Sequence, residues 1–407
     1  MGRTTSEMAG ESRNSRPSSI RCLISPGITT PGDRVFCLPQ SKANKALNKL
    51  TITLDAKHKR SYSRAMNKLD RVTRAHILHL LCEGQSIRAV TRLTGASKNT
   101  ITKLVVDAGH ACTEYQDRVL RNLPSKRVQV DEIWNFIYAK NDNVKAAKAA
   151  PADAGDVWTW TAIDADTKLL VSWLVADRTT DSAMMFMDDL KERLANRVQL
   201  TSDGHRPHLT AVDTVFGNDI DYAMLQKIYG ADPVGEKRYS PAKCIGAQKR
   251  EITGNPDPKH VSTSYVERQN LTMRMHMRRF TRLTNAFSKK IENHACAVAL
   301  HSMYYNFVRL HQTLKVSPAM ASGVTDRLWE MVDVVDMLDA FEAKRKRAAE
   351  PIFEVQQWAI GGGYYVRATL PDGTIDRIEG FATEGEAGRW IKNESVVWLN
   401  EQAKRLA

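Results

Sequence analysis

One glutamate opens a segment of the chain that otherwise carries only positive charge. Between Ser264 and Arg282 the sequence has five arginines and one acid, Glu267. If this segment is a helix of 3.6 residues per turn, the polar residues on the same side as Glu267 are Asn270, Arg274, Arg278 and Arg282. The apolar residues expected to face a core are Met273, Met277 and Phe280. An acid beside a row of arginines is typical of a site where the acid holds a metal ion and the cations hold phosphates.

Two aspartates upstream complete such a site. Asp131 lies within a predicted strand, and Asp203 ends another. Hard divalent ions are held by a few carboxylates together with water and phosphate oxygens. Two ions about 3.5–4 Å apart clamp the attacking and leaving oxygens of a phosphoryl displacement. We therefore expect Asp131, Asp203 and Glu267 to bind Mg²⁺, with Mn²⁺ as a substitute. Glu132 competes with Asp131 for the first position, but as its strand neighbour it should point to the opposite face of the sheet.

Composition points to a polyanionic partner. The chain has 407 residues, with 59 Lys and Arg against 46 Asp and Glu, and a formal net charge of +13. This excess favours nucleic acid first and an anionic membrane second. No apolar run approaches the roughly 18 residues of a membrane helix, and the N-terminus has no apolar signal core. The six cysteines are scattered without a CxxC pair, which argues against a disulfide framework or a zinc ribbon and favours a reducing cytoplasm.

Periodicity and composition divide the chain into five parts. Residues 1–60 are rich in Ser, Pro, Gly and Arg, which predicts a basic disordered arm. Residues 61–120 are expected to form a helical DNA-binding domain, and residues 121–335 a catalytic domain. A charged helical linker over 336–352 and a small ββα module of unknown role over 353–407 follow.

The second part has the layout of a helix-turn-helix unit. A helix ends near Gly84, Ser86 caps a second helix with Val90 and Leu93 inward, and the turn at 94–97 leads into a third. In such units the last helix enters the major groove of DNA. The residues expected to face DNA are Lys98, Asn99, Thr100 and Lys103, and those expected to pack are Ile101, Leu104 and Val105. An ordinary three-helix bundle is the alternative.

The third part alternates strands with a helix. Strands are predicted over 128–137, 157–163, 169–175 and 197–203, and a helix over 182–194. Three strands, a helix and another strand form an α/β order that is compatible with a mixed sheet. His205 and His208, just after the fourth strand, could tune the site or contact phosphate, but they are expected to be surface loop residues. In the C-terminal module, a hairpin over 358–381 precedes a helix that Thr383 and Glu386 would cap.

Four segments in order carry a resemblance to a known family. They are VDEIW (130–134), TSDGH (201–205), TSYVERQN (263–270) and YNFVRLHQTLKVSPA (305–319). With these segments, residues 67–330 resemble the bacterial insertion-sequence transposases of the DDE class. In the last segment, Asn306, Arg309 and His311 match the C-terminal signature that many such transposases share.

The resemblance implies an RNase H-like catalytic core whose metal-binding acids are Asp131, Asp203 and Glu267. It implies Mg²⁺-dependent cleavage of DNA at the ends of the element and attack of the freed 3′-OH on target DNA. The implied partners are double-stranded DNA, as terminal inverted repeats and as target, and further copies of the chain in a homodimer or higher oligomer. The implied location is the bacterial cytoplasm, in association with the nucleoid. Some relatives have an N-terminal zinc-binding cysteine cluster that Cys22 and Cys37 do not supply, so no zinc is expected.

Arg309 and His311 have two interpretations. We expect them to position DNA or to brace the helix that carries Glu267. An arginine and a histidine are also used by tyrosine recombinases, which need a second arginine and an exposed tyrosine nucleophile. Tyr304 and Tyr305 lie in an apolar segment and are expected to be packing residues instead.

Two other functions fit part of the sequence. A decayed transposase could act as a repressor through residues 98–105, but such a copy has no reason to keep all three acids. An RNase H-type nuclease that cuts without joining does not need a separate DNA-reading domain. We therefore predict a DDE transposase with an α/β fold of RNase H type, a preceding helix-turn-helix domain and a ββα tail.

Overall fold

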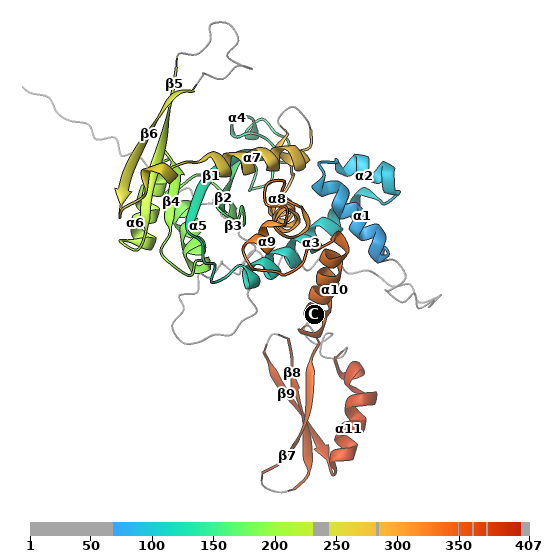
Figure 1. Cartoon of the computed structure of the whole chain (residues 1–407). Helices are drawn as coiled ribbons and strands as arrows, with labels where there is room; N and C mark the ends of the chain where they lie inside the picture. Colours follow the sequence, from blue (N-terminus) through green and yellow to red (C-terminus); the bar gives the residue numbers. More distant parts are fainter. Residues whose placement is uncertain are drawn as a thin grey trace, which may run out of the picture. The chain divides into compact units, whose positions relative to one another are not determined.

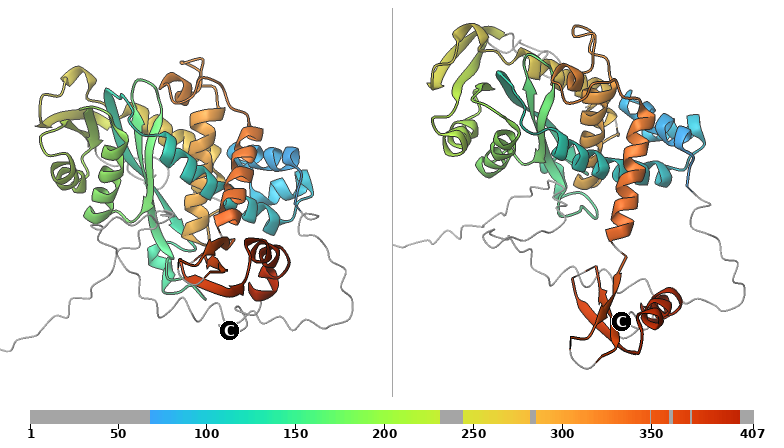
Figure 2. Two further views of the ribbon diagram at one scale, coloured as in Figure 1. Left: turned by 90° about the horizontal axis from the view of Figure 1, so that it is seen from below. Right: turned by 60° about the horizontal axis from the view of Figure 1, so that its bottom comes forward.

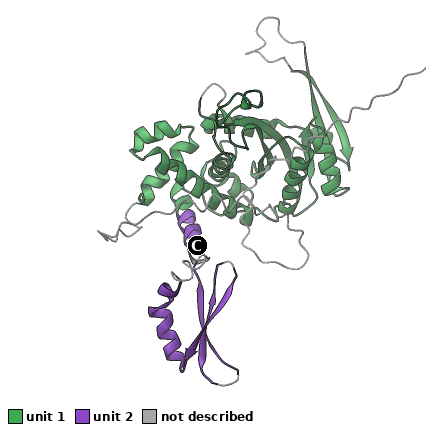
Figure 3. Ribbon diagram, turned by 180° about the vertical axis from the view of Figure 1, so that it is seen from behind, with its two compact units in different colours: residues 1–335 green, residues 336–407 purple. Residues whose placement is uncertain are grey.

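The computed structural model describes residues 68–230, 244–281, 285–348, 350–359, 362–371 and 373–399. The predicted basic arm and Arg282 lie outside these ranges. The chain forms two compact units, residues 1–335 and residues 336–407 (Figure 3). No helix within the described ranges is long and apolar enough to cross a membrane.

Three helices begin the described part of the first unit: α1 (Arg71–Cys82), α2 (Ile87–Thr94) and α3 (Lys98–Val119). Ser86 caps α2 as predicted, because its Oγ accepts a hydrogen bond from Ala89 N at 3.1 Å. Gly95 ends α2 at φ 72°, a left-handed conformation that glycine adopts without steric cost. The prediction that Leu93 points inward is wrong: Val90 is fully buried, but Leu93 is 63 % exposed. The short α2 contacts both α1 and α3.

A six-stranded mixed sheet lies in the first unit (Figure 1). Its strands are β1 (Arg127–Ile137), β2 (Gly155–Asp164), β3 (Leu170–Ala176), β4 (Gln199–Asp203), β5 (Asp221–Tyr229) and β6 (Cys244–Thr253). Their order is β3-β2-β1-β4-β5-β6, in which β1, β2 and β3 pair antiparallel and β4 and β5 run parallel to β1. Strand β6 returns antiparallel to β5. The predicted mixed α/β sheet is confirmed and is compatible with an RNase H-like core, although β5 and β6 were not predicted.

Helices cover both faces of this sheet. The longer ones are α5 (Thr180–Arg193), α6 (Pro207–Phe216), α7 (Ser264–His276) and α8 (Ile291–Met303). On β2, Trp160 packs against His208 of α6, whereas the next residue, Thr161, donates a hydrogen bond to Asn270 of α7. Since successive strand residues point to opposite faces, α6 and its neighbour α5 lie on one face and α7 on the other. Shorter elements are α4 (Asn141–Val144), the 3-10 turn η3 (Pro258–His260), the π-helical turn η5 (Tyr304–Val308) and α9 (Pro318–Ala321).

Helix α7 ends earlier than predicted. Met277 is extended, at φ −113° and ψ 104°, and a short 3-10 turn, η4 (Arg278–Phe280), follows it. The predicted apolar residues Met273, Met277 and Phe280 are nevertheless buried together in a core that includes residues of β1 and α8. The bend keeps these side chains in the core, but it takes Arg278 off the helical face of Glu267. The prediction that Arg278 shares this face is therefore wrong.

Helix α3 packs along α8 (Figure 2). A Cβ added to Gly109 would lie 2.3 Å from Cys296 Cβ, so only glycine fits at this crossing. Gln116 is buried there, donates through Nε2 to Ala299 O at 3.2 Å and accepts from Ser302 Oγ at 2.7 Å. The long α3 thus belongs both to the N-terminal three helices and to the body that contains the sheet.

The second unit contains β7 (Ile352–Gln357), β8 (Tyr364–Thr369), β9 (Ile375–Phe381) and α11 (Glu384–Asn393), and α10 (Met331–Ala348) spans the boundary between the units. The predicted ββα tail is therefore a βββα unit, with β7 antiparallel to β8. Phe353 of β7 packs edge-on against Trp390 of α11, with ring centroids 6.1 Å apart, so the missed strand contributes to the small core. The predicted cap is confirmed, since Thr383 Oγ1 accepts from Glu386 N at 3.3 Å.

Candidate active site

Asp131 lies on the face of β1 that meets α7. In the β1–β2 ladder Asp131 pairs with Thr161, and residues that pair across a ladder share a face. Asn270 Nδ2 donates to Asp131 Oδ2 at 2.7 Å, and Asn270 Oδ1 accepts from Thr161 Oγ1 at 3.1 Å. Asn270 is only 4 % exposed. Both ends of its amide are thus used inside the protein to hold Asp131, which disfavours the predicted contact of Asn270 with DNA; that contact stays a prediction.

Strand pairing brings Asp203 next to Asp131. β4 runs parallel to β1 with Thr201 opposite Gln129, and each aspartate lies two residues further along its strand. One carboxylate oxygen from each of Asp131, Glu132 and Asp203 lies within 4.8 Å of the others. The two predicted aspartates are thus brought together where β4 ends beside the middle of β1.

The environment of Asp131 disfavours its charged form. Burial, the largest cause, together with the nearby Glu132 and Asp203 raises the pKa of Asp131 from 3.8 to about 7. Clustered carboxylate oxygens with an excess of negative charge are the donor set that Mg²⁺ and Mn²⁺ prefer. The residues present therefore fit a hard divalent cation.

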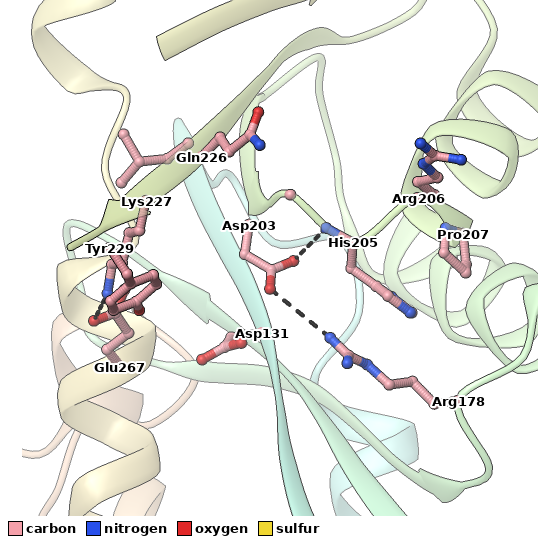
Figure 4. A pocket seen from close by; sticks show the side chains of 12 residues that line it. Asp131, Arg178, Asp203, His205, Arg206, Pro207, Gln226, Lys227, Tyr229 and Glu267 are labelled. Atoms are coloured by element: carbon pink, nitrogen blue, oxygen red, sulfur yellow. Dashed lines mark hydrogen bonds and ion pairs between the residues drawn. The ribbon is translucent and has the colours of Figure 1, made fainter. Parts of the chain in front are cut away.

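Glu267 lines the same pocket but is not within the 4.8 Å cluster. It lies in the first turn of α7, as predicted, and its side chain is directed at Lys227 of β5 (Figure 4). Lys227 Nζ lies 2.5 Å from Glu267 Oε2, and Thr263 Oγ1 hydrogen-bonds to the other oxygen. Burial lowers the pKa of Lys227, but the contact with Glu267 outweighs it, so the net shift is upward. The third predicted acid is thus present in the pocket and paired with a lysine.

Glu132 faces the opposite side of the sheet from Asp131, as predicted. Its side chain is 1 % exposed and contacts Arg178, His205 and His208. Arg178 donates to Glu132 Oε2 through Nε at 3.2 Å and Nη2 at 2.9 Å, and Nη2 lies 3.9 Å from Asp203 Oδ2. Burial raises the pKa of Glu132, but the two histidines outweigh it and hold the pKa well below its usual range.

Sequence reasoning missed this second group of residues. His208 is fully buried and the His205 side chain is only 14 % exposed, so the prediction that both are surface loop residues is wrong. Pro207 starts α6 here, which turns His208 into the sheet face beside Trp160. The pair of histidines directly after an aspartate was the available signal. Arg178 had no signal in the sequence, because it meets Glu132 only through the pairing of distant strands.

The arginines predicted to contact phosphates lie in different parts of the chain's structure. Arg274 is exposed on α7, and Arg278 is exposed on the 3-10 turn beyond it. Arg282 lies outside the described residues. In the N-terminal helices Lys98, Asn99, Thr100 and Lys103 are exposed, and Ile101, Leu104 and Val105 are buried, as the predicted pattern requires. Whether these polar residues contact DNA stays a prediction.

Arg309 supports the helix that carries Glu267. Its Nη1 lies 2.7 Å from Nε2 of His276, the last residue of α7. His311 is half-buried, and its Nδ1 contacts Thr313 Oγ1 at 3.0 Å. Tyr304 and Tyr305 are 5 % and 6 % exposed, which confirms them as packing residues and disfavours a tyrosine nucleophile.

No protein-family model and no curated protein sequence matches the chain. Among solved structures, a piggyBac transposase synaptic complex with hairpin DNA is similar at 8 % identity and a TM-score of 0.31, over 70 % of this chain and 76 % of that one. A simian T-cell lymphotropic virus intasome in complex with PP2A regulatory subunit B56 gamma is similar at 12 % identity and a TM-score of 0.28, over 75 % and 95 % of the two chains. Both TM-scores are below 0.5, so any function has to be inferred from the residues of the site.

Proposed function

We propose that this chain is a DDE transposase of the bacterial insertion-sequence type, a metal-dependent polynucleotidyl transferase. The observation that carries the proposal is the placement of Asp131, Asp203 and Glu267. They come from the first strand, the end of the fourth strand and a helix on one face, and they line one pocket. Three acids on elements far apart in the sequence have no structural need to meet around an open pocket.

Asp131, Asp203 and Glu267 would hold Mg²⁺, with Mn²⁺ as a substitute. Such ions, when bound, activate water or a 3′-OH and stabilise the charge that develops on the phosphate. The ion pair between Lys227 and Glu267 would have to open before the Glu267 carboxylate could bind an ion. Arg178 lines the pocket beside Asp203, where its guanidinium can face the phosphate of a bound strand.

DNA would be held outside the pocket by exposed cations. Arg274 and Arg278 lie on α7 and just after it, and we propose that they contact the backbone. Lys98, Asn99, Thr100 and Lys103 would read the terminal inverted repeats. Two ends have to be joined to one target, so a homodimer or larger assembly in the bacterial nucleoid is part of the proposal.

A joining assay separates this proposal from its two alternatives. Purified protein would be incubated with Mg²⁺ or Mn²⁺ and DNA from the two ends that flank its gene, beside the Glu267→Gln variant. The proposal expects cleavage at the ends and joining to target, both lost in the variant. Cutting without joining would indicate an RNase H-type nuclease. Binding without cutting by either protein would indicate a repressor derived from a transposase.

A further inference from the structure

Three buried side-chain atoms converge on one point on the α6 face of the sheet. They are Glu132 Oε1, His205 Nδ1 and His208 Nε2. The glutamate oxygen lies 3.6 Å from the His205 nitrogen and 2.7 Å from the His208 nitrogen. All three atoms lie within 4.8 Å of one another. They belong to β1, to the segment after β4 and to α6, so the fold brings them together from separate elements.

These three atoms contact one another but make no aligned hydrogen bond. None of them has a hydrogen-bond partner among the residues that the structure describes, and each is shielded from solvent. The contact of His208 with Glu132 is short, but the atoms are not aligned as a hydrogen bond. Burying polar atoms without partners is costly, and most buried polar atoms in proteins are satisfied. Three such atoms that point at one another therefore indicate a missing ligand between them.

We propose that Glu132, His205 and His208 form a binding site for a transition-metal dication, with Zn²⁺ as the best fit. Two imidazole nitrogens and one carboxylate oxygen are a donor set that zinc accepts, whereas Mg²⁺ prefers oxygen alone. Ligands at 2.0–2.2 Å from a tetrahedral ion lie about 3.3–3.6 Å apart, which the Glu132–His205 separation of 3.6 Å matches. The Glu132–His208 separation of 2.7 Å would have to widen when the ion binds. The site is thus chemically distinct from the acidic pocket next to it.

The surroundings of the three ligands support this assignment. Arg178 holds Glu132 through Oε2, which leaves Oε1 directed at the histidines. Ligating carboxylates are commonly fixed by such a second hydrogen-bonding group. Trp160 packs against both imidazole rings, at 5.8 Å from His205 and 5.4 Å from His208 between centroids, and limits their rotation.

An ion at this point would tie β1 to the segment that follows β4. Glu132 is the neighbour of Asp131, and His205 follows Asp203 by two residues. The ion would therefore fix the relative position of the two aspartates without touching a substrate. The absence of an N-terminal cysteine cluster, on which the expectation of no zinc rests, has no bearing on a His and Glu site. The proposal does not depend on whether the acidic pocket acts on DNA.

Metal content and affinity test the site. The full chain would be stripped with a chelator, reloaded with Zn²⁺, passed through gel filtration and analysed for metal by mass spectrometry. Affinity would be measured by competition with a chromophoric chelator, and Co²⁺ would report nitrogen ligation through its visible absorption. We expect zinc to be retained in stoichiometric amount and to raise the melting temperature.

Three variants identify the ligands. His205→Asn and Glu132→Gln should each weaken Zn²⁺ binding by at least roughly tenfold. This is the lower end of the loss of metal affinity when a residue that only hydrogen-bonds to a metal ligand is mutated. His208 is fully buried, so His208→Asn identifies a ligand only if its circular dichroism spectrum matches that of wild type. If that variant does not fold, His205→Asn still tests the site, because the His205 side chain is partly exposed. The exposed His260→Asn is the matched control and should bind zinc as wild type does.

Two results would overturn the proposal. One is the loss of all zinc from wild-type protein on gel filtration. The other is zinc that is retained by His205→Asn but lost from an Asp131→Asn, Asp203→Asn double variant, which would place the ion in the acidic pocket.

Discussion

Lys227 Nζ lies 2.5 Å from Glu267 Oε2, so a lysine of β5 neutralises the acid that α7 brings to the pocket. No ion pair of Asp131 is found among the described residues; its carboxylate accepts a hydrogen bond from Asn270 and lies near the carboxylates of Glu132 and Asp203. Glu267 and Asp131 are therefore in different electrostatic surroundings before any ion binds. Glu267 is paired, whereas the pKa of Asp131 is raised to about 7.

Removing Lys227 should make metal binding tighter. In Lys227→Met, Glu267 no longer has a competing cation and is available as a ligand. Both side chains are about one-third exposed, so the pair is worth roughly 0–1 kcal/mol, which corresponds to a gain of up to about fivefold in Mn²⁺ affinity. Isothermal titration calorimetry with Mn²⁺ measures this, and Lys249→Met on the neighbouring strand is the control. Weaker binding in Lys227→Met would show that the lysine supports the site instead of blocking it.

Stability of the metal-free protein should fall as pH rises toward neutrality. The pKa of Asp131 is about 7 in the fold against 3.8 ordinarily, so protonation favours the folded state. This contribution is fully present below about pH 4 and is lost as pH rises through about 7. Asp131→Asn keeps an uncharged side chain and should be more stable than wild type at pH 8, by up to about 4 kcal/mol. Urea unfolding in a chelating buffer from pH 5 to 8 tests this, and parallel curves for the two proteins would contradict it.

Asn270 should matter for the position of Asp131 and not for DNA affinity. In Asn270→Ala the buried Asp131 oxygen loses its donor, which should cost about 1–3 kcal/mol of unfolding free energy. Chemical unfolding and a fluorescence DNA-binding assay separate the two roles. Arg274→Ala, at an exposed position of α7, is the control, and we expect it to lower DNA affinity and to leave the unfolding free energy nearly unchanged. A large loss of DNA affinity in Asn270→Ala with unchanged stability would support a direct contact of Asn270 with DNA instead.

The crossing of α3 and α8 should tolerate no side chain at Gly109. A methyl group there would meet Cys296 Cβ at 2.3 Å, and overpacking of this kind costs typically about 1–3 kcal/mol. Gly109→Ala should therefore lower the melting temperature. Gly388→Ala is the matched control, because nothing lies within 4 Å of an added Cβ in α11 and alanine favours a helix. Equal melting temperatures for Gly109→Ala and wild type would show that α3 and α8 separate easily.

Many strands and helices could be predicted because their apolar residues recur at the spacing of a strand or a helix and are the residues that the fold buries. Strands β1 to β4 have alternating or continuous apolar residues and α5 has a helical apolar pattern, and the structure places all five within a few residues of the prediction. Strand β6 has almost no buried residue and hence no alternation to detect. In α7 the apolar spacing continues past His276 although the helix does not, because a 3-10 turn after Met277 also directs Phe280 into the core.

The site could be predicted only as far as residue types indicate chemistry. Asp131, Asp203 and Glu267 were predicted because carboxylates within a strand, at a strand end and at a helix start suggest a cation site. Their partners were not found, since Lys227 is 40 residues from Glu267 and Asn270 is 139 residues from Asp131. Contacts over such distances depend on strand order and register, which a single sequence does not give.

Titration of the chelator-treated protein with Mn²⁺, followed by electron paramagnetic resonance, tests most directly whether the three acids form one metal centre. Wild type would be compared with Glu267→Gln and with Glu192→Gln, whose exposed side chain lies on α5 away from the pocket. We predict that Glu267→Gln weakens Mn²⁺ binding by at least roughly tenfold and that Glu192→Gln leaves it unchanged. Binding by Glu267→Gln as tight as that of wild type would contradict the account and leave Asp131, Glu132 and Asp203 as the acids that hold the ion.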